Sequence, residues 1–326
     1  MKNIKFSNTD LNVSELCLGT ANFGTARSAE ESFEQLNLFL EAGGNFIDTA
    51  LVYGDWGCDE KGRSEKVIGQ WLTQCGKRDQ VIISTKGCHP PAEDMSIPRV
   101  SPAEIRSDVE KSLQNLKTDY IDLYFLHRDN PQVSVAEILE TLEEEVKKGK
   151  LRYYGCSNWT LDRVKEAADY GKAHGLQGFS CNQILMALAD VDMTSIEWTQ
   201  MKILGEDFYQ YHKESVLNLM AFQCISGGYF SKRLAGRSIS EGQRAMYDCP
   251  ANDAILEKLA AFAKEGYDPM DFLLCYVLNA SFPAVPIASF GSPEQLKAAV
   301  SSLEKQVPAE MLQELIALKQ VQKYRW

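Results

Sequence analysis

The amino-acid sequence predicts an α/β protein with the fold of a (β/α)8 TIM barrel, in which eight parallel strands alternate with helices and close into a ring. Three observations predict this fold class. Short β-rich runs alternate with amphipathic helical patterns from residue 16 onward, the units follow one another without a linker or a break in composition, and 326 residues suffice for one large domain. We therefore expect a single barrel domain over residues 1–326.

The expected strands are short runs rich in apolar, β-branched and aromatic residues. They lie at residues 16–20, 45–50, 81–86, 120–127, 153–158, 179–184, 217–224 and 284–289. An open, doubly wound parallel sheet is the alternative fold. It would need a G-x-G-x-x-G sequence between the first strand and the first helix, whereas this chain has GTANFGTARS at residues 19–28. The closed barrel is therefore favoured.

Helical patterns with apolar residues spaced near 3.6 separate the strands. They include residues 29–43, 64–74, 101–116, 134–149 and 161–175. Capping signals mark their ends, since Ser101 precedes Pro102, Ser134 has Glu137 at capping-box spacing, and three of the patterns end on glycine. Residues 225–250 interrupt the alternation as a long polar loop after the seventh strand, and residues 304–326 predict an extra C-terminal helix.

Composition limits the class of partner. The net charge is −11 without a basic stripe, which argues against nucleic acid, and the apolar runs are too short to span a membrane. No secretion signal is recognisable, so we expect a cytoplasmic protein with a small-molecule ligand and leave its oligomeric state open. Nine cysteines without a C-x-x-C pair indicate reduced thiols, and four histidines without H-x-H or H-E-x-x-H spacing predict no metal site.

Ionisable residues end three successive predicted strands. Asp48 closes the second strand, Lys86 the third and His127 the fourth, and Tyr53 follows Asp48 in the next loop. Each residue alone has an ordinary structural explanation, as a turn former, a solvated lysine or a hydrogen-bonded histidine. Because the carboxyl ends of barrel strands meet on one face, their joint occurrence predicts a catalytic site there.

The four residue types suit proton transfer. Lys86 and Asp48 would offset each other's cost of burial, and the ammonium would favour the phenolate of Tyr53, lowering its pKa from the ordinary value of about 10. We expect Tyr53 to act as a general acid and His127 either to orient a carbonyl oxygen or to relay its proton. Such a set would add a proton to an oxygen while another group delivers a hydride.

Several segments carry a family resemblance. GGNFIDTALVYG at 43–54, LKTDYIDLYFLHR at 116–128 and KGKLRYYGCSNW at 148–159, with SEKVIGQWL and PEQL in the matching order, resemble the aldo/keto reductase superfamily over nearly the whole chain. The resemblance implies NAD(P)H-dependent reduction of a small carbonyl compound, an aldehyde or a ketone, with Asp48, Tyr53, Lys86 and His127 as the catalytic tetrad.

The resemblance also implies a cofactor site. Ser157, Asn158 and Gln183 would bind the nicotinamide carboxamide, and Phe222 would stack on the ring. The full implied set is Gly19, Thr20, Ser157, Asn158, Gln183, Phe222, Gln223, Cys224, Ile225, Lys232, Ser289, Gly291 and Gln295.

The cofactor's adenine end departs from the family pattern. Members that prefer NADP(H) carry a cation after the eighth strand to hold the 2'-phosphate. This chain has Ser289, Gly291 and Gln295 there, and Ala298 and Ala299 replace the usual Glu-Asn pair. Either NAD(H) is accepted, or the phosphate contacts another cation. Lys297, or Lys232 and Arg233 in the long polar segment, are the candidates for that contact.

Residues in the loops after the first five strands are expected to contact the substrate. They are Phe23, Trp56, His89, Arg128 and Trp159. Arg128 and His89 would favour a hydroxylated or anionic carbonyl compound. Two other functions stay open: an aldolase in which Lys86 forms a Schiff base, and a non-catalytic cofactor-binding sensor or regulatory subunit.

Overall fold

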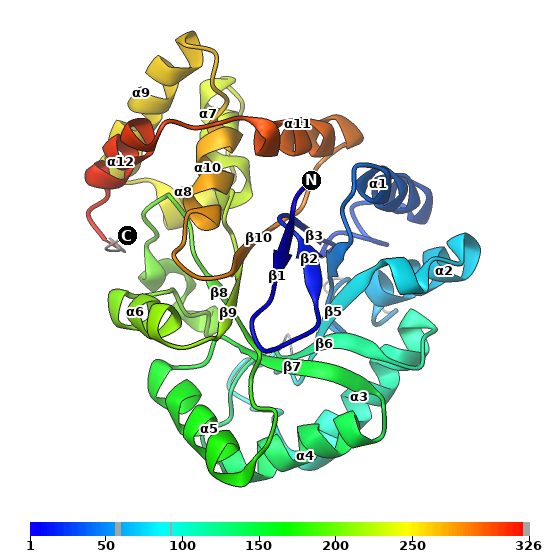
Figure 1. Ribbon diagram of the computed structural model, residues 1–326. Helices are drawn as coiled ribbons and strands as arrows, with labels where there is room; N and C mark the ends of the chain where they lie inside the picture. Colours follow the sequence, from blue (N-terminus) through cyan, green and yellow to red (C-terminus); the bar gives the residue numbers. More distant parts are fainter. Residues whose placement is uncertain (56–59, 92, 322–326) are drawn as a thin grey trace.

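The barrel is closed by eight parallel strands in the spatial order β10-β3-β4-β5-β6-β7-β8-β9. The structure is a computed structural model that describes residues 1–55, 60–91 and 93–321. The strands form the centre of the molecule and the helices surround them (Figure 1). The strands are β3 (Cys17–Gly19), β4 (Phe46–Asp48), β5 (Ile82–Gly87), β6 (Ile121–Leu126), β7 (Leu151–Ser157), β8 (Cys181–Leu185), β9 (Asn218–Phe222) and β10 (Ala284–Ala288). The (β/α)8 fold and all eight expected strand positions are confirmed.

The helices follow the expected alternation. The first five are α1 (Ala29–Glu41), α2 (Arg63–Cys75), α3 (Pro102–Leu116), α4 (Val135–Lys147) and α5 (Leu161–His174). The remaining long helices are α6 (Glu206–Glu214), α9 (Pro250–Lys264), α10 (Pro269–Leu278), α11 (Pro293–Glu304) and α12 (Ala309–Leu318). Capping fixes their starts: the side chains of Ser101 and Ser134 accept hydrogen bonds from the backbone N–H groups of Glu104 and Glu137.

An N-terminal hairpin covers one end of the barrel. Strands β1 (Asn3–Lys5) and β2 (Asn12–Ser14) pair antiparallel, and the view along the barrel shows them in front of its strands (Figure 1). Phe6 and Val13 are buried with Phe46, Phe125 and other inward-facing residues of the barrel. The sequence analysis missed this hairpin because three-residue strands are too short to show a period of two.

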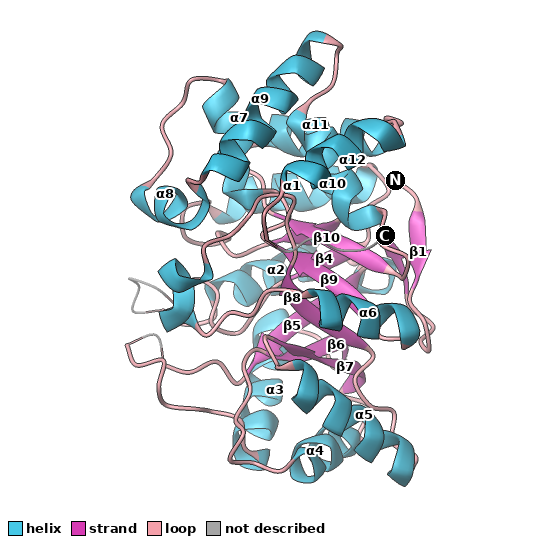
Figure 2. Cartoon of the chain, turned by 90° about the vertical axis from the view of Figure 1, so that its left-hand side faces the viewer, coloured by secondary structure: helices cyan, strands magenta, loops and turns pink. Residues whose placement is uncertain are grey.

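The loops that follow the strands lie at the opposite end from the hairpin (Figure 2). Residues 225–250, expected to be a polar loop, instead form a short 3-10 turn η3 (Ser226–Gly228) and two helices, α7 (Tyr229–Leu234) and α8 (Glu241–Tyr247). Tyr229, Phe230 and Tyr247 pack into the core, so spaced aromatic residues order a segment that reads as polar overall. The expected extra C-terminal helix is present as α12.

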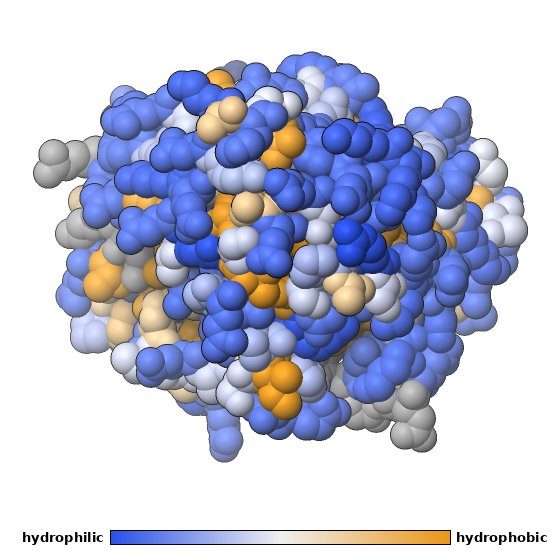
Figure 3. Space-filling model, turned by 90° about the horizontal axis from the view of Figure 1, so that it is seen from below, coloured by the Kyte–Doolittle hydropathy of each residue, from blue (hydrophilic) through white to orange (hydrophobic). Residues whose placement is uncertain are grey.

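One face of the molecule shows how polar and apolar residues are distributed on the surface. The face seen from below is mostly hydrophilic, with small apolar patches that polar atoms separate (Figure 3). Within the described ranges, no helix has both the length and the apolar character to cross a membrane.

Candidate active site

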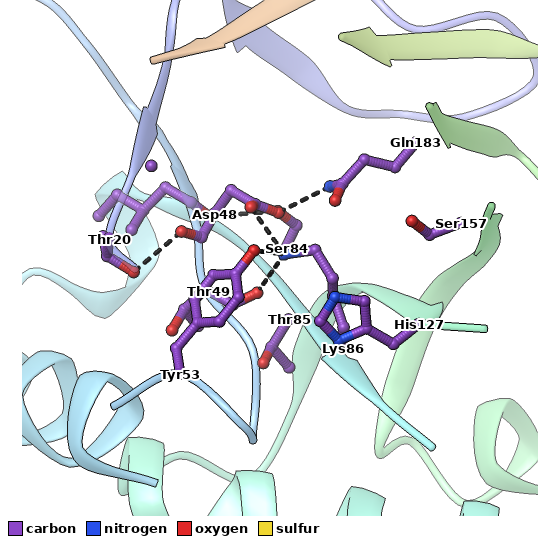
Figure 4. Close-up of polar contacts among 12 residues, drawn as sticks. Thr20, Asp48, Thr49, Tyr53, Ser84, Thr85, Lys86, His127, Ser157 and Gln183 are labelled. Carbon is purple, nitrogen blue, oxygen red and sulfur yellow. Dashed lines mark hydrogen bonds and ion pairs between the residues drawn. The ribbon is translucent and has the colours of Figure 1, made fainter. Parts of the chain in front are cut away.

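Lys86 occupies the centre of the polar contacts at the carboxyl ends of β4 and β5. Its Nζ donates hydrogen bonds to Asp48 Oδ2 at 2.7 Å, to the Thr49 carbonyl at 2.6 Å and to the Tyr53 hydroxyl at 3.2 Å (Figure 4). An ammonium has three N–H groups, so these acceptors use all of them. Lys86 is only 1% exposed, and its position is therefore fixed by its partners.

Asp48 is held as firmly as Lys86. Its Oδ1 accepts hydrogen bonds from the Ser84 hydroxyl at 2.7 Å and from Gln183 Nε2 at 2.8 Å, and its other oxygen faces Lys86. A carboxylate that ends a buried strand would be costly without such donors. Burial by itself would lower the pKa of Lys86, but Asp48, followed by Tyr53, raises it above its ordinary value. Lys86 therefore stays charged.

Tyr53 follows β4 in a turn in which its backbone N–H bonds to the Ala50 carbonyl at 3.0 Å. The centroid of its ring lies 4.6 Å from Lys86 Nζ. The ring also packs edge-on against the His127 ring, with the two centroids 6.0 Å apart. Burial raises the pKa of the Tyr53 phenol above its ordinary value, and Lys86 opposes this only in part. The expectation of a lowered pKa is therefore wrong for this structure, because desolvation outweighs the neighbouring cation.

His127 lies just beyond β6, and its backbone N–H bonds to the Gly87 carbonyl at 2.9 Å. Its side chain is buried, and burial, followed by His89, Arg128 and Lys86, holds its pKa well below the ordinary value. The imidazole is therefore neutral near neutral pH. Its Nδ1 is buried and has no hydrogen-bond partner among the described residues, so a ligand could supply one.

A cavity of about 470 Å³ opens above these residues. Asp48, Tyr53 and His127 line it together with most of the expected cofactor residues: Gly19, Thr20, Ser157, Asn158, Gln183, Phe222, Gln223, Ile225 and Ser289. A second cavity of about 630 Å³ is lined in part by Lys86 and shares His89 with the first. Of the four tetrad residues only Lys86 lines it, so we place the candidate site in the smaller cavity.

The polar groups expected to contact nicotinamide are pre-positioned. Asn158 has a left-handed backbone with φ of 63°, and its Nδ2 donates to Ser157 Oγ at 2.9 Å. Its Oδ1 accepts the Lys202 backbone N–H at 3.0 Å. Gln183 reaches from β8 to Asp48, while Ser157 projects from β7 (Figure 4). Gln183 thus orients the carboxylate of the tetrad as well as lining the cavity.

Of the residues expected at the adenine end of the cofactor, only some line the cavity. The Ser289 hydroxyl donates to the Gly19 carbonyl at 2.8 Å and lines the cavity. Gly291 and Gln295 bond to each other at 2.6 Å and are not among the residues that line it. Cys224 was expected at the cofactor site directly after the seventh strand rather than at the adenine end. Its thiol is buried and donates to the Ile287 carbonyl, so its side chain faces the core.

Two of the three candidate cations near this end, Lys232 and Arg233, already have partners. Lys232 Nζ donates to Gln243 Oε1 at 3.0 Å, which ties α7 to α8. Arg233 pairs with Asp253 at 2.7 Å and donates to the Tyr229 hydroxyl at 2.7 Å. Ala299 is buried in the core, so it is not available as an adenine contact.

The expected substrate residues divide into two groups. His89 and Arg128 line the cavity. Phe23 and Trp159 do not: each is at most 1% exposed and packs in the core, which corrects the expectation for both. Their rings turn inward because the core buries more of their surface than the cavity wall would. Trp56 lies outside the described residues.

The sequence analysis missed three large apolar residues that long loops bring to the cavity. Met95 comes from the loop after β5, and Trp198 and Met201 come from the segment around η2 (Met193–Thr199). Trp198 is 71% exposed. They belong to long connections without periodicity or a recognisable motif, so no signal in the sequence assigns them to this face.

Comparison with known proteins agrees with the geometry. Residues 15–320 match the sequence model of the Aldo/keto reductase family, and the chain belongs to this family. The uncharacterized oxidoreductase YrpG of Bacillus subtilis is 28% identical over 94% of this chain and 92% of its own length. The norsolorinic acid reductase stcV of Emericella nidulans is 29% identical over 94% of this chain and 78% of its own length.

A solved structure extends the agreement to the fold. The aldo-keto reductase AKR11C1 from Bacillus halodurans, in its holo form, superimposes with a TM-score of 0.76 and 25% identity, covering 98% of this chain and 97% of that one. The family and these oxidoreductase relatives support an enzyme of carbonyl reduction.

Proposed function

We propose that this protein reduces an aldehyde or ketone with a hydride from NAD(P)H and that Tyr53 donates the proton. The observation that carries the proposal is the set of contacts at Lys86, whose ammonium holds Asp48 and the Tyr53 hydroxyl at once beside the cavity. A structural salt bridge would not need a tyrosine oxygen at the cavity wall.

The proton transfer follows from the protonation states. The raised pKa keeps Tyr53 protonated at neutral pH, as an acid requires. The hydroxyl proton would pass to the carbonyl oxygen as the carbonyl carbon accepts the hydride, and an alcohol would form. Lys86 would then stabilise the phenolate that remains, because its N–H already points at that oxygen.

His127 is suited to position the substrate. A neutral imidazole has one N–H donor, which can bind the same carbonyl oxygen without competing for its proton. The edge-on contact with Tyr53 keeps both side chains at one wall of the cavity. We assign His127 the role of orienting and polarising the carbonyl.

The cavity fits the nicotinamide group of the cofactor. The Ser157 hydroxyl can bind a carboxamide, and Asn158 holds that hydroxyl in place through Nδ2 while its Oδ1 keeps one lone pair for the ligand. Phe222 offers a flat apolar surface at the end of β9. When bound, the reduced ring supplies the hydride. We propose NADP(H) as the cofactor, from the family, with NAD(H) also accepted because the usual 2'-phosphate cation is absent after β10, where the chain has Ser289, Gly291 and Gln295.

Separate titrations with NADPH and NADH, followed by fluorescence, test the cofactor, and a panel of aldehydes and ketones with the tighter binder tests the reaction. The proposal expects saturable binding and consumption of the cofactor only when a carbonyl compound is present. Binding without turnover of any carbonyl would instead favour a non-catalytic sensor. Borohydride trapping of substrate on Lys86 would favour an aldolase.

A further inference from the structure

Arg128 is a buried cation at the wall of the candidate site. Its side chain is 6% exposed and lines the cavity beside Tyr53 and His127. Burial lowers its pKa to about 10, so the guanidinium remains charged at neutral pH. A charge removed from water in this way is costly unless an opposite charge compensates it.

The partners of Arg128 in the described part of the chain are backbone carbonyls. Nε and Nη2 donate to the Thr199 carbonyl at 3.0 and 2.9 Å, and Nη1 donates to the His127 carbonyl at 2.8 Å. No Asp or Glu of residues 1–55, 60–91 or 93–321 forms an ion pair with it. A guanidinium has five N–H groups, so two remain for a ligand.

The rest of the cavity leaves this charge uncompensated. Asp48 is neutralised by Lys86. His127 is neutral, and burial, followed by Arg128, lowers the pKa of His89 to about 4, so this second histidine is neutral as well. Among the described residues that line the cavity, Arg128 therefore supplies the net charge, which is positive.

The position of Arg128 favours the substrate over the cofactor as its ligand. Arg128 follows β6 and is next to β7, whose expected nicotinamide contacts, Ser157 and Asn158, bind an uncharged group. The residue expected at the phosphate-bearing end of the cofactor, Ser289, follows β10, four strands further around the barrel. Apolar groups of Met95, Met201 and Trp198 line the same cavity. A ligand with an anionic group on an apolar or aromatic body would pair with the Arg128 charge and also pack against these apolar side chains.

We propose that the substrate is a carbonyl compound that also carries a carboxylate, and that Arg128 is the specificity-determining residue that binds this carboxylate. The inference rests on the proposed function. A planar guanidinium matches a carboxylate in geometry as well as in charge, which a lysine does not.

Matched substrate pairs test the inference: 2-, 3- and 4-formylbenzoate against their methyl esters, with NADPH. The wild type should prefer one acid over its ester by on the order of 10-fold in kcat/KM, and salt should reduce this preference. Equal values for every acid and ester pair would overturn the inference. This comparison needs no variant.

Variants then connect the preference to Arg128. Arg128→Met should raise KM for the preferred acid by on the order of 10–100-fold while the ester is reduced nearly as before, and Arg128→Lys should keep part of the preference. Arg163→Met is the control, since Arg163 pairs with Asp129 and is not among the cavity-lining residues. Equal losses for acid and ester in Arg128→Met would indicate a structural role and overturn the assignment.

A binding measurement separates this inference from the proposed function. Calorimetry should show that (hydroxymethyl)benzoate binds the NADPH complex more tightly than its methyl ester, and that Arg128→Met removes the difference. If no aldehyde is reduced but this difference is present, the proposed function falls and the anion site stands. If the aldehydes are reduced but the difference is absent, only the inference falls.

Discussion

At the scale of single residues, the site depends on the hydrogen bonds of Lys86. The ammonium donates to a carboxylate, a carbonyl and a phenol, so it cannot move toward one of them without losing another. This fixes the Tyr53 oxygen in place before any substrate binds. Preorganisation of this kind lowers the cost of reaching the transition state, because the groups need not reorient during the reaction.

Tyr53→Phe tests the proton donor. Loss of the hydroxyl should lower kcat by roughly 10²–10⁴-fold, since general acid catalysis contributes about that much. The ring remains, so the affinity for NADPH, measured by fluorescence titration, should change little.

Tyr170→Phe is the matched control, because Tyr170 bonds to Glu140 on the helices outside the barrel. It should leave kcat unaltered. If Tyr53→Phe kept the turnover of the wild type, Tyr53 would not be the proton donor.

At the scale of elements, the N-terminal hairpin and the helical segment after β9 act at opposite ends of the barrel. The hairpin buries Phe6 against Phe46, with ring centroids 5.8 Å apart. The helices α7 and α8 lie on the side of the strand-end loops (Figure 2). Stability and cofactor binding should therefore be separable by mutation.

Phe6→Ala should lower the free energy of unfolding by about 3–5 kcal/mol, because it leaves a cavity beneath the barrel. Urea denaturation measures this change. Activity at a temperature where the protein stays folded should be close to that of the wild type.

Lys5→Ala is the comparison, since Lys5 is exposed, and it should have little effect on unfolding. A loss of kcat in folded Phe6→Ala as large as that in Tyr53→Phe would contradict the separation of the two ends.

Lys232→Ala tests whether α7 contributes to the cofactor site. If Lys232 leaves Gln243 to contact the 2'-phosphate, the substitution should weaken NADPH binding by roughly 10-fold and NADH binding hardly at all. Fluorescence titration with both cofactors measures the ratio.

Lys258→Ala on α9, which removes a cation paired with Glu314, should not change that ratio. Equal effects of Lys232→Ala on both cofactors would mean that Lys232 only ties α7 to α8.

At the scale of the whole molecule, buried histidines should make stability depend on pH. Burial lowers the pKa of His212 to about 4, and that of His127 well below its ordinary value. In the unfolded chain each has a pKa of about 6.5, so below this pH the unfolded state binds more protons than the folded state. The stability is present above pH 6.5 and is lost as the pH falls.

The free energy of unfolding, measured by urea denaturation from pH 7.5 to pH 5, should therefore decline below about pH 6.5 by up to about 1.4 kcal/mol per pH unit for each such histidine, and the urea midpoint should fall with it. His212→Asn should reduce the slope, and His174→Gln, at an exposed position, should not. A midpoint that stays constant over this range would disprove the prediction.

The sequence by itself determined the barrel, the eight strand positions and the residues at the strand ends. Alternation of strand and helix patterns is a local property, and parallel strands bring their carboxyl ends to one face whatever the loops do. Asp48, Lys86 and His127 could therefore be placed together from their positions alone. The family resemblance added the expectation for the cofactor, and the family match confirms that resemblance.

Only the tertiary structure decided the direction of the Tyr53 pKa, the inward turn of Phe23 and Trp159, and the isolation of Arg128 from carboxylates in the described residues. Each depends on groups distant in the chain that together remove water or supply partners. Desolvation is a sum over all such neighbours, whereas a sequence pattern reports only the next few residues. The hairpin and helices α7 and α8 were missed for the same reason, since long-range packing orders segments whose local signals are weak.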